Sequence, residues 1–93
     1  MKYRFTRHAF EKISLMKKYG FSVNQEKIIL TIEKPVKKET KGWNFIATSI
    51  LDKTHVLRVV YRQEDDIIII ITIYPGRIKS YLWNTLTTDN QMF

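Results

Sequence analysis

The sequence predicts an α+β protein in which two N-terminal helices pack on one face of a twisted antiparallel sheet of three to four strands. Apolar residues recur at helical spacing early in the chain, whereas runs rich in β-branched and aromatic residues follow from residue 43 to residue 74. This segregation of helices from strands is typical of the α+β class. We expect one domain over residues 1–83, followed by a polar tail, residues 84–93, that is poorly ordered.

The N-terminal segment predicts a short strand followed by a helix. Lys2–Thr6 alternates polar with aromatic residues and has too few apolar positions for more than an edge strand. Thr6 is a good helix N-cap, and the helix runs from Arg7 to about Tyr19 with an apolar stripe on one side. Gly20 ends it.

A second helix follows directly. Ser22–Gln25 has the form of a capping box, and the apolar stripe behind it continues until Pro35. We therefore expect a helix over Val23–Lys34. The polar segment 36–42 is a connection with room for a short edge strand.

Three strands in a meander are expected next, at 43–51, 55–63 and 67–74. Polar breaks at 52–54 and 63–66 mark the turns between them.

The alternation of side chains along these strands sorts them into two faces. On the last strand, Ile67, Ile69, Ile71 and Ile73 share one side, which we expect to lie under the helices. The other face then carries the polar side chains Arg58, Arg62, Thr72 and Tyr74. The first strand of the meander adds Thr48 or Asn44 to it. These are either a basic, hydroxyl-bearing working surface or the ordinary solvated side of an antiparallel sheet.

Composition narrows the partners. Sixteen Lys and Arg against nine Asp and Glu give a formal net charge of +7, so we expect polyanionic partners: nucleic acid, an acidic protein or, less well, an anionic membrane surface. No apolar run approaches the roughly 20 residues of a membrane span, and no export signal is visible, so we expect a cytoplasmic protein. Without cysteine, and with two His and no Gly-rich phosphate loop, we expect no metal or nucleotide cofactor.

The order of several short motifs resembles a known family. The motifs are Thr6-Arg7-His8-Ala9, Tyr19-Gly20-Phe21-Ser22, Glu33-Lys34-Pro35, Leu57-Arg58-Val59-Val60-Tyr61, Ile71-Thr72-Ile73-Tyr74 and Arg77. Together they resemble a small family that is grouped with the RelE-like and colicin-D-like toxin nucleases of the barnase–EndoU–colicin–RelE superfamily. Where that family often has Arg four residues after the His, this chain has Lys12.

The resemblance implies a metal-independent endoribonuclease toxin of a toxin–antitoxin pair, with RNA as substrate and an acidic antitoxin protein as partner. By position it implies that His8, Arg58 and Thr72 face one groove, with Arg77 beside them. His8 would transfer protons, the two arginines would hold the phosphate, and Thr72 would donate a hydrogen bond. The residues expected to bind RNA around this group are Lys12, Arg62, Tyr74, Lys79 and Tyr81.

Each of these residues also has an interpretation that involves no function. His8 is equally a helix N-terminal residue with no role, and His55, beside a turn, is the spare acid–base group. Trp43 invites base stacking, but a tryptophan at a strand start also covers the edge of a core. Two other functions remain open: a non-catalytic basic module that binds RNA or an acidic protein, and a structural subunit that dimerises through strand 67–73 as an apolar edge.

Overall fold

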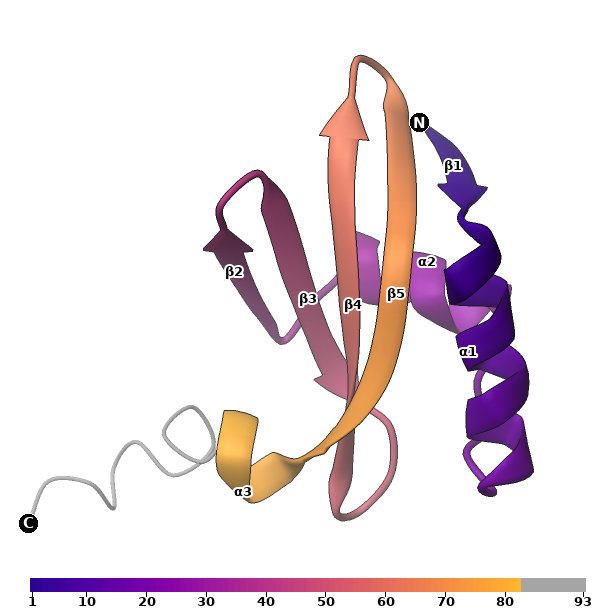
Figure 1. The fold of residues 1–93 in the computed structure, drawn as a ribbon. Coiled ribbons are helices and arrows are strands. Elements are labelled where there is room, and N and C mark those ends of the chain that lie inside the picture. The colour runs from indigo at the N-terminus through magenta and orange to yellow at the C-terminus, as the bar shows by residue number, and fades with distance from the viewer. Residues whose placement is uncertain (83–93) are drawn as a thin grey trace, which may run out of the picture.

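The computed structural model describes residues 1–82 and confirms the α+β class (Figure 1). The sheet is larger than predicted, with five strands in the order β1-β5-β4-β3-β2, and it is mixed rather than antiparallel. The strands are β1 (Lys2–Phe5), β2 (Lys37–Lys41), β3 (Asn44–Ile50), β4 (His55–Glu64) and β5 (Ile67–Arg77). The helices are α1 (Arg7–Lys18), α2 (Gln25–Glu33) and the single turn α3 (Ile78–Tyr81).

The predicted C-terminal tail, residues 84–93, lies outside the described residues. Among residues 1–82, no helix is long and apolar enough to cross a membrane.

Strand β5 lies inside the sheet rather than at its edge. It pairs in parallel with β1, through Tyr3↔Ile68 and Phe5↔Ile70, and antiparallel with β4 on its other side. The premise of dimerisation through a free 67–73 edge is therefore wrong, because β4 pairs with the whole strand on one side and β1 pairs with residues 67–70 on the other.

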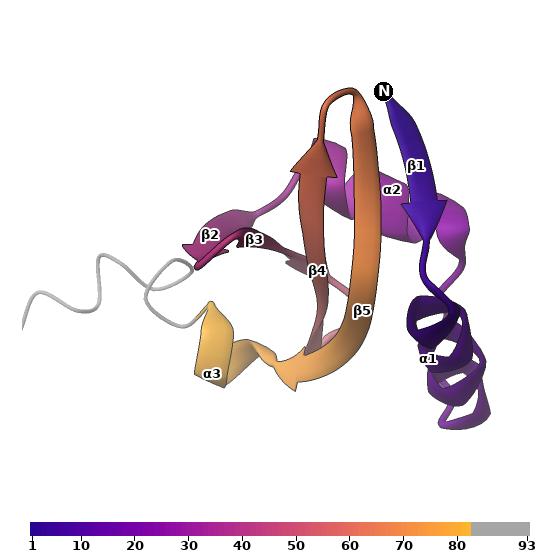
Figure 2. The ribbon, with the colours of Figure 1, turned by 45° about the horizontal axis from the view of Figure 1, so that its top comes forward.

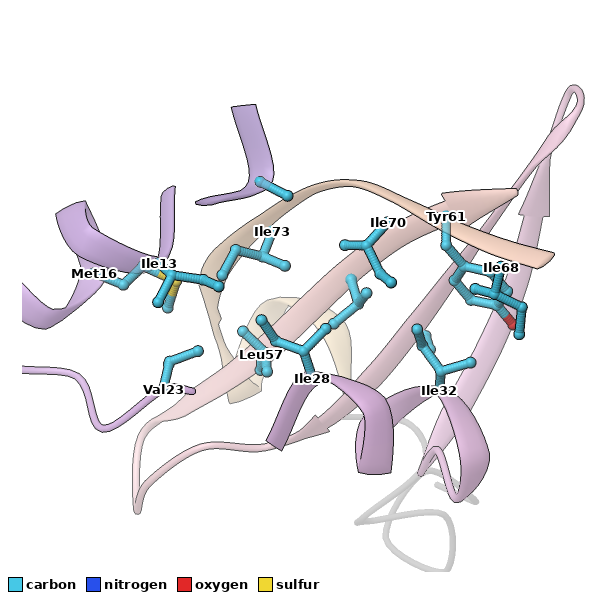
Figure 3. Packing of buried hydrophobic residues seen from close by; sticks show 13 residues of the cluster. Ile13, Met16, Val23, Ile28, Ile32, Leu57, Tyr61, Ile68, Ile70 and Ile73 are labelled. Carbon is cyan, nitrogen blue, oxygen red and sulfur yellow. The ribbon is translucent and has the colours of Figure 1, made fainter. Parts of the chain in front are cut away.

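Helices α1 and α2 cover one face of the sheet and form the main core with it (Figure 3). The core cluster consists of Ala9, Ile13, Met16, Val23, Ile28, Ile32, Ala47, Leu57, Val59, Tyr61, Ile68, Ile70 and Ile73. Each fully buried aliphatic side chain in it contributes about 1.5–3 kcal/mol relative to exposure to water. We call this side of the sheet the helix face.

A β-bulge in β5 changes which isoleucines reach this core. The register passes from Tyr61↔Ile70 to Val60↔Thr72, which leaves Ile71 without a partner on β4. Side-chain alternation therefore shifts by one residue at this point. Ile73 faces the helices as predicted, but Ile68 and Ile70 take the core places that the sequence pattern assigned to Ile67, Ile69 and Ile71.

Thr6 fastens the bulge to α1. Its hydroxyl donates to the carbonyl oxygen of Ile71 at 2.8 Å and accepts from the backbone N–H of Ala9 at 3.1 Å, which makes it the N-cap of α1. One side chain thus satisfies a carbonyl of the bulged residue and an N–H group of the first helical turn.

We predict that Thr6→Ala lowers the free energy of unfolding by about 1–2 kcal/mol, because the change removes both hydrogen bonds. Thr6→Ser, which keeps the hydroxyl, should cost less than half as much. Urea denaturation followed by circular dichroism measures both. Equal losses in the two variants would show that the methyl group of Thr6, rather than its hydroxyl, supports the bulge.

Candidate nucleic-acid interface

The face of the sheet opposite α1 and α2 carries Arg58, and we call it the arginine face. The register Thr48↔Arg58↔Tyr74 places these three side chains side by side across β3, β4 and β5. Val60↔Thr72 forms the next row. The prediction that Arg58, Thr72 and Tyr74 share one face is confirmed.

Arg58 is a buried cation held by three neighbouring strands. Only 4% of the residue is exposed, and its Nη1 donates to Glu39 Oε1 at 2.5 Å and to Thr48 Oγ1 at 2.9 Å. Its Nε donates to the hydroxyl of Tyr74 at 3.3 Å. Nε and Nη1 of the guanidinium are therefore engaged by the protein, and Arg58 serves as a structural charge rather than as a free phosphate ligand.

The protonation states follow from this contact. Burial disfavours the charge of Arg58, but the hydrogen bonds with Glu39 and Tyr74 outweigh that cost and raise the pKa of the guanidinium. The hydrogen bond from Arg58 also lowers the pKa of the Glu39 carboxyl below its ordinary value of 4.5. At neutral pH the pair is ionic.

Helix α3 closes the lower part of the arginine face, on the side of the sheet away from α2 (Figure 2). The ring of Tyr81 stacks on Arg58, with the guanidinium carbon 4.1 Å from the ring centroid, and Lys37 Nζ donates to the carbonyl of Tyr81 at 3.2 Å. Gly76 permits this approach, since a Cβ atom there would lie 2.3 Å from a carbon of the Tyr81 ring. Leu82, the residue that follows Tyr81, is fully buried.

The upper part of the arginine face is open and basic. Lys41, Arg62 and Arg4 stand at one level of β2, β4 and β1, through Lys41↔Asn44, Arg62↔Ile69 and Arg4↔Ile69, and all three are exposed. We call these three residues the basic row.

The strands of the arginine face carry six basic and two acidic residues, which gives a formal net charge of +4 for that face. These are Lys2, Arg4, Lys37, Lys41, Arg58 and Arg62 against Glu39 and Glu64. A hollow beneath the basic row is lined by Lys41, Asn44, Ile46, Val60 and Tyr74. The open surface is therefore suited to an anionic ligand.

The structure does not gather the four predicted catalytic residues in one groove. His8 is exposed on α1, whose buried residues Ala9 and Ile13 pack with Leu57 on the helix face, opposite Arg58. The prediction that His8 and Arg58 converge is therefore wrong, because Leu57 and Arg58, which are neighbours on β4, point to opposite sides of the sheet.

The remaining predicted residues are spread over three regions. Lys12 is half-buried on α1 with His8, whereas Thr72 and Tyr74 lie on the arginine face. Arg77 and Lys79 are exposed at the C-terminal end of β5 and on α3.

A cluster of polar residues around His55, which the sequence did not predict, lies at the lower end of the sheet. His55 Nδ1 is 3.0 Å from Asp52 Oδ1, and Arg77 is the register partner of His55 on β5. Asp52 Oδ1 also accepts the backbone N–H groups of Thr54 and His55, and these hydrogen bonds, that of Thr54 first, lower the pKa of Asp52. The visible signal was an Asp-x-x-His spacing at a hairpin turn, which places both side chains around one loop.

The chemistry of this cluster is that of an oriented imidazole. When Nδ1–H is donated to Asp52, the lone pair of Nε2 is free to accept a proton. Phe21 borders the ring edge to face, with centroids 5.0 Å apart, and 32% of the His55 side chain is exposed. Arg77, its cross-strand partner at the end of β5, is exposed on the neighbouring strand.

No protein-family model matches the chain, and no curated protein or solved structure matches it. Within residues 1–82, no three or more His, Asp or Glu side chains are grouped so that they could hold a metal ion.

We predict that Glu39→Gln lowers the free energy of unfolding at pH 7 by about 1–2 kcal/mol, because it removes the countercharge of a buried guanidinium while keeping a hydrogen-bond acceptor. The Glu39 side chain is itself 37% exposed, which moderates the loss. Since folding lowers the pKa of Glu39, the ion pair stabilises the protein above pH 4.5 and is lost as the pH falls through the folded-state value. The gap between variant and wild type should therefore narrow below pH 4.5.

The matched control is Glu64→Gln, which breaks an ion pair with Arg62 that is exposed on both sides, at 44% and 54%. We expect little change from it at any pH. The free energy of unfolding is measured by denaturation at several values between pH 3 and pH 7. A difference between wild type and Glu39→Gln that stays constant over this range would contradict the ionic role of Glu39.

Proposed function

We propose that the protein binds RNA on the upper, open part of the arginine face. The observation that carries this proposal is the basic row, Lys41, Arg62 and Arg4, which crosses the sheet as three exposed cations at one level. Phosphate groups of a nucleic-acid strand are regularly spaced, so a row of cations meets several of them at once. The net charge of +7 supports the same class of ligand.

Binding by such contacts is electrostatic and should weaken as salt is added. Arg62 also forms an exposed ion pair with Glu64 at 2.6 Å, a contact that contributes little and that a phosphate can replace. The buried Arg58 lies outside this exchange, because its hydrogen bonds are already made within the protein.

A second candidate function is RNA cleavage by a cytoplasmic toxin. The resemblance to the RelE-like and colicin-D-like nucleases suggests it, together with a RelE-like fold and an acidic antitoxin as partner. The observation that favours it is the pairing of Arg77, one of the predicted catalytic residues, with an imidazole held by Asp52. In this proposal His55 Nε2 takes the proton of the 2′-hydroxyl as its oxygen attacks phosphorus, Arg77 stabilises the charged phosphorane, and the leaving 5′-oxygen takes a proton from water.

We predict that the triple variant Arg4→Gln, Lys41→Gln, Arg62→Gln weakens binding to single-stranded RNA. It should reduce the slope of log affinity against log salt concentration by about 2, since each lost phosphate contact accounts for about 0.7 on a single strand. Fluorescence anisotropy of a labelled RNA over a salt series measures this slope.

The matched control removes the same charge elsewhere, by Arg7→Gln, Lys18→Gln and Lys53→Gln, all at exposed positions on α1 or in the β3–β4 loop. Its slope should stay close to that of the wild type. If both triple variants lose affinity and slope equally, net charge alone governs binding and the basic row is not the site.

For the cleavage candidate we predict that His55→Ala lowers RNA cleavage in the presence of a chelator by about 100-fold or more, whereas His8→Ala leaves it unchanged. The products should end in a 2′,3′-cyclic phosphate, which gel mobility before and after acid treatment reveals. Cleavage that depends on His8 and not on His55 would move the site to α1. Absence of cleavage in the wild type would leave RNA binding as the function.

A further inference from the structure

Trp43 is the most exposed large apolar side chain of the described residues, with 95% of its surface open to solvent. It does not cover the edge of the core, as one interpretation of the sequence expected. It occupies the second position of the two-residue turn Gly42–Trp43 between β2 and β3, and Gly42 has a φ of +62°, which favours glycine. The short hairpin turn places the indole at the end of the sheet, open to solvent.

The surroundings of Trp43 are polar and charged rather than apolar, and the cation among them, Arg62, is ion-paired with Glu64. A hollow beside it is lined by Trp43, Asn44, Arg62, Gln63 and Glu64. Asn44 also lines the hollow beneath the basic row, so the two depressions adjoin.

These residues form a set that fits one nucleotide. A flat aromatic ring offers a stacking surface, and the amides of Asn44 and Gln63 offer donors and acceptors for the edge of a base. Arg62 offers a cation for the phosphate when the phosphate replaces Glu64 in its exposed ion pair. An apolar protein ligand would take the Asn44 amide and the Arg62–Glu64 ion pair out of water without offering them new polar partners, which disfavours it as the occupant.

We propose that an unpaired base of the RNA stacks on Trp43, and that the ligand of this protein is therefore single-stranded RNA. This inference rests on the proposed RNA binding and deepens it. Bases within a duplex are stacked on their neighbours and cannot present a free face to Trp43, whereas an extended single strand can follow the basic row and place one base on the indole.

The test uses fluorescence of Trp43 in a Trp83→Phe background, which leaves it the only tryptophan of the chain. A short oligouridylate should quench this fluorescence on binding, whereas inorganic polyphosphate, which carries the charge without bases, should bind without quenching it. A duplex RNA of the same length should bind more weakly than the single strand at equal salt.

Trp43→Ala, compared with Trp43→Phe, measures the contribution of stacking. The alanine variant should weaken oligouridylate binding about 5- to 100-fold and leave polyphosphate binding unchanged, and the phenylalanine variant should retain most of the affinity. Because the side chain is almost fully exposed, neither change should alter folding, which thermal denaturation checks.

The outcomes separate this inference from the proposal on which it rests. If oligouridylate binds in a salt-dependent way but equally to wild type and Trp43→Ala, RNA binding stands and the base site is wrong. The same result is expected if Trp43 binds a protein partner instead. If neither oligouridylate nor polyphosphate binds the wild type, the proposed function fails and the base site fails with it.

Discussion

The buried guanidinium of Arg58 is the contact on which the arrangement of the sheet depends. From β4 it reaches Glu39 on β2, Thr48 on β3 and Tyr74 on β5, and the ring of Tyr81 on α3 covers it. An unpaired charge at such a depth costs several kcal/mol, so the strands are stable together only in the register that supplies all of these partners. One side chain thus specifies the order and register of four strands and the position of α3.

This constraint divides the arginine face into a covered part and an open part. The lower part is closed, because Tyr81 lies on Arg58 and Leu82 is buried beside it. The upper part has no such cover among the described residues, and there the cations are exposed and Trp43 stands free. In the function we propose, stability and ligand binding use different arginines of the same strand, Arg58 and Arg62, four residues apart on one face.

Much of this architecture could be predicted from local patterns. Alternation along β4 and along the end of β5 correctly placed Arg58 on one face with Thr72 and Tyr74, and the α+β class followed from the segregation of helices and strands. The bulge at Ile71 could not be predicted, since in a continuous isoleucine run either alternation fits a buried strand. The parallel pairing of β1 with β5 could not be predicted either, because it joins segments more than sixty residues apart that no hairpin turn connects directly. For the site, the net charge predicts a polyanionic ligand, whereas the family resemblance grouped His8 with Arg58 and the structure puts them on opposite sides of the sheet.

We propose that the ligand-binding surface is the upper arginine face and the β2–β3 turn rather than the exposed side of α1. Titration of the ¹⁵N-labelled protein with a short oligouridylate, followed by amide chemical shifts, tests it most directly. We expect the largest changes at Arg4, residues 41–44 and Arg62, and none along residues 7–18. The largest changes at residues 8–12 of α1, with the β2–β3 turn unaffected, would contradict it.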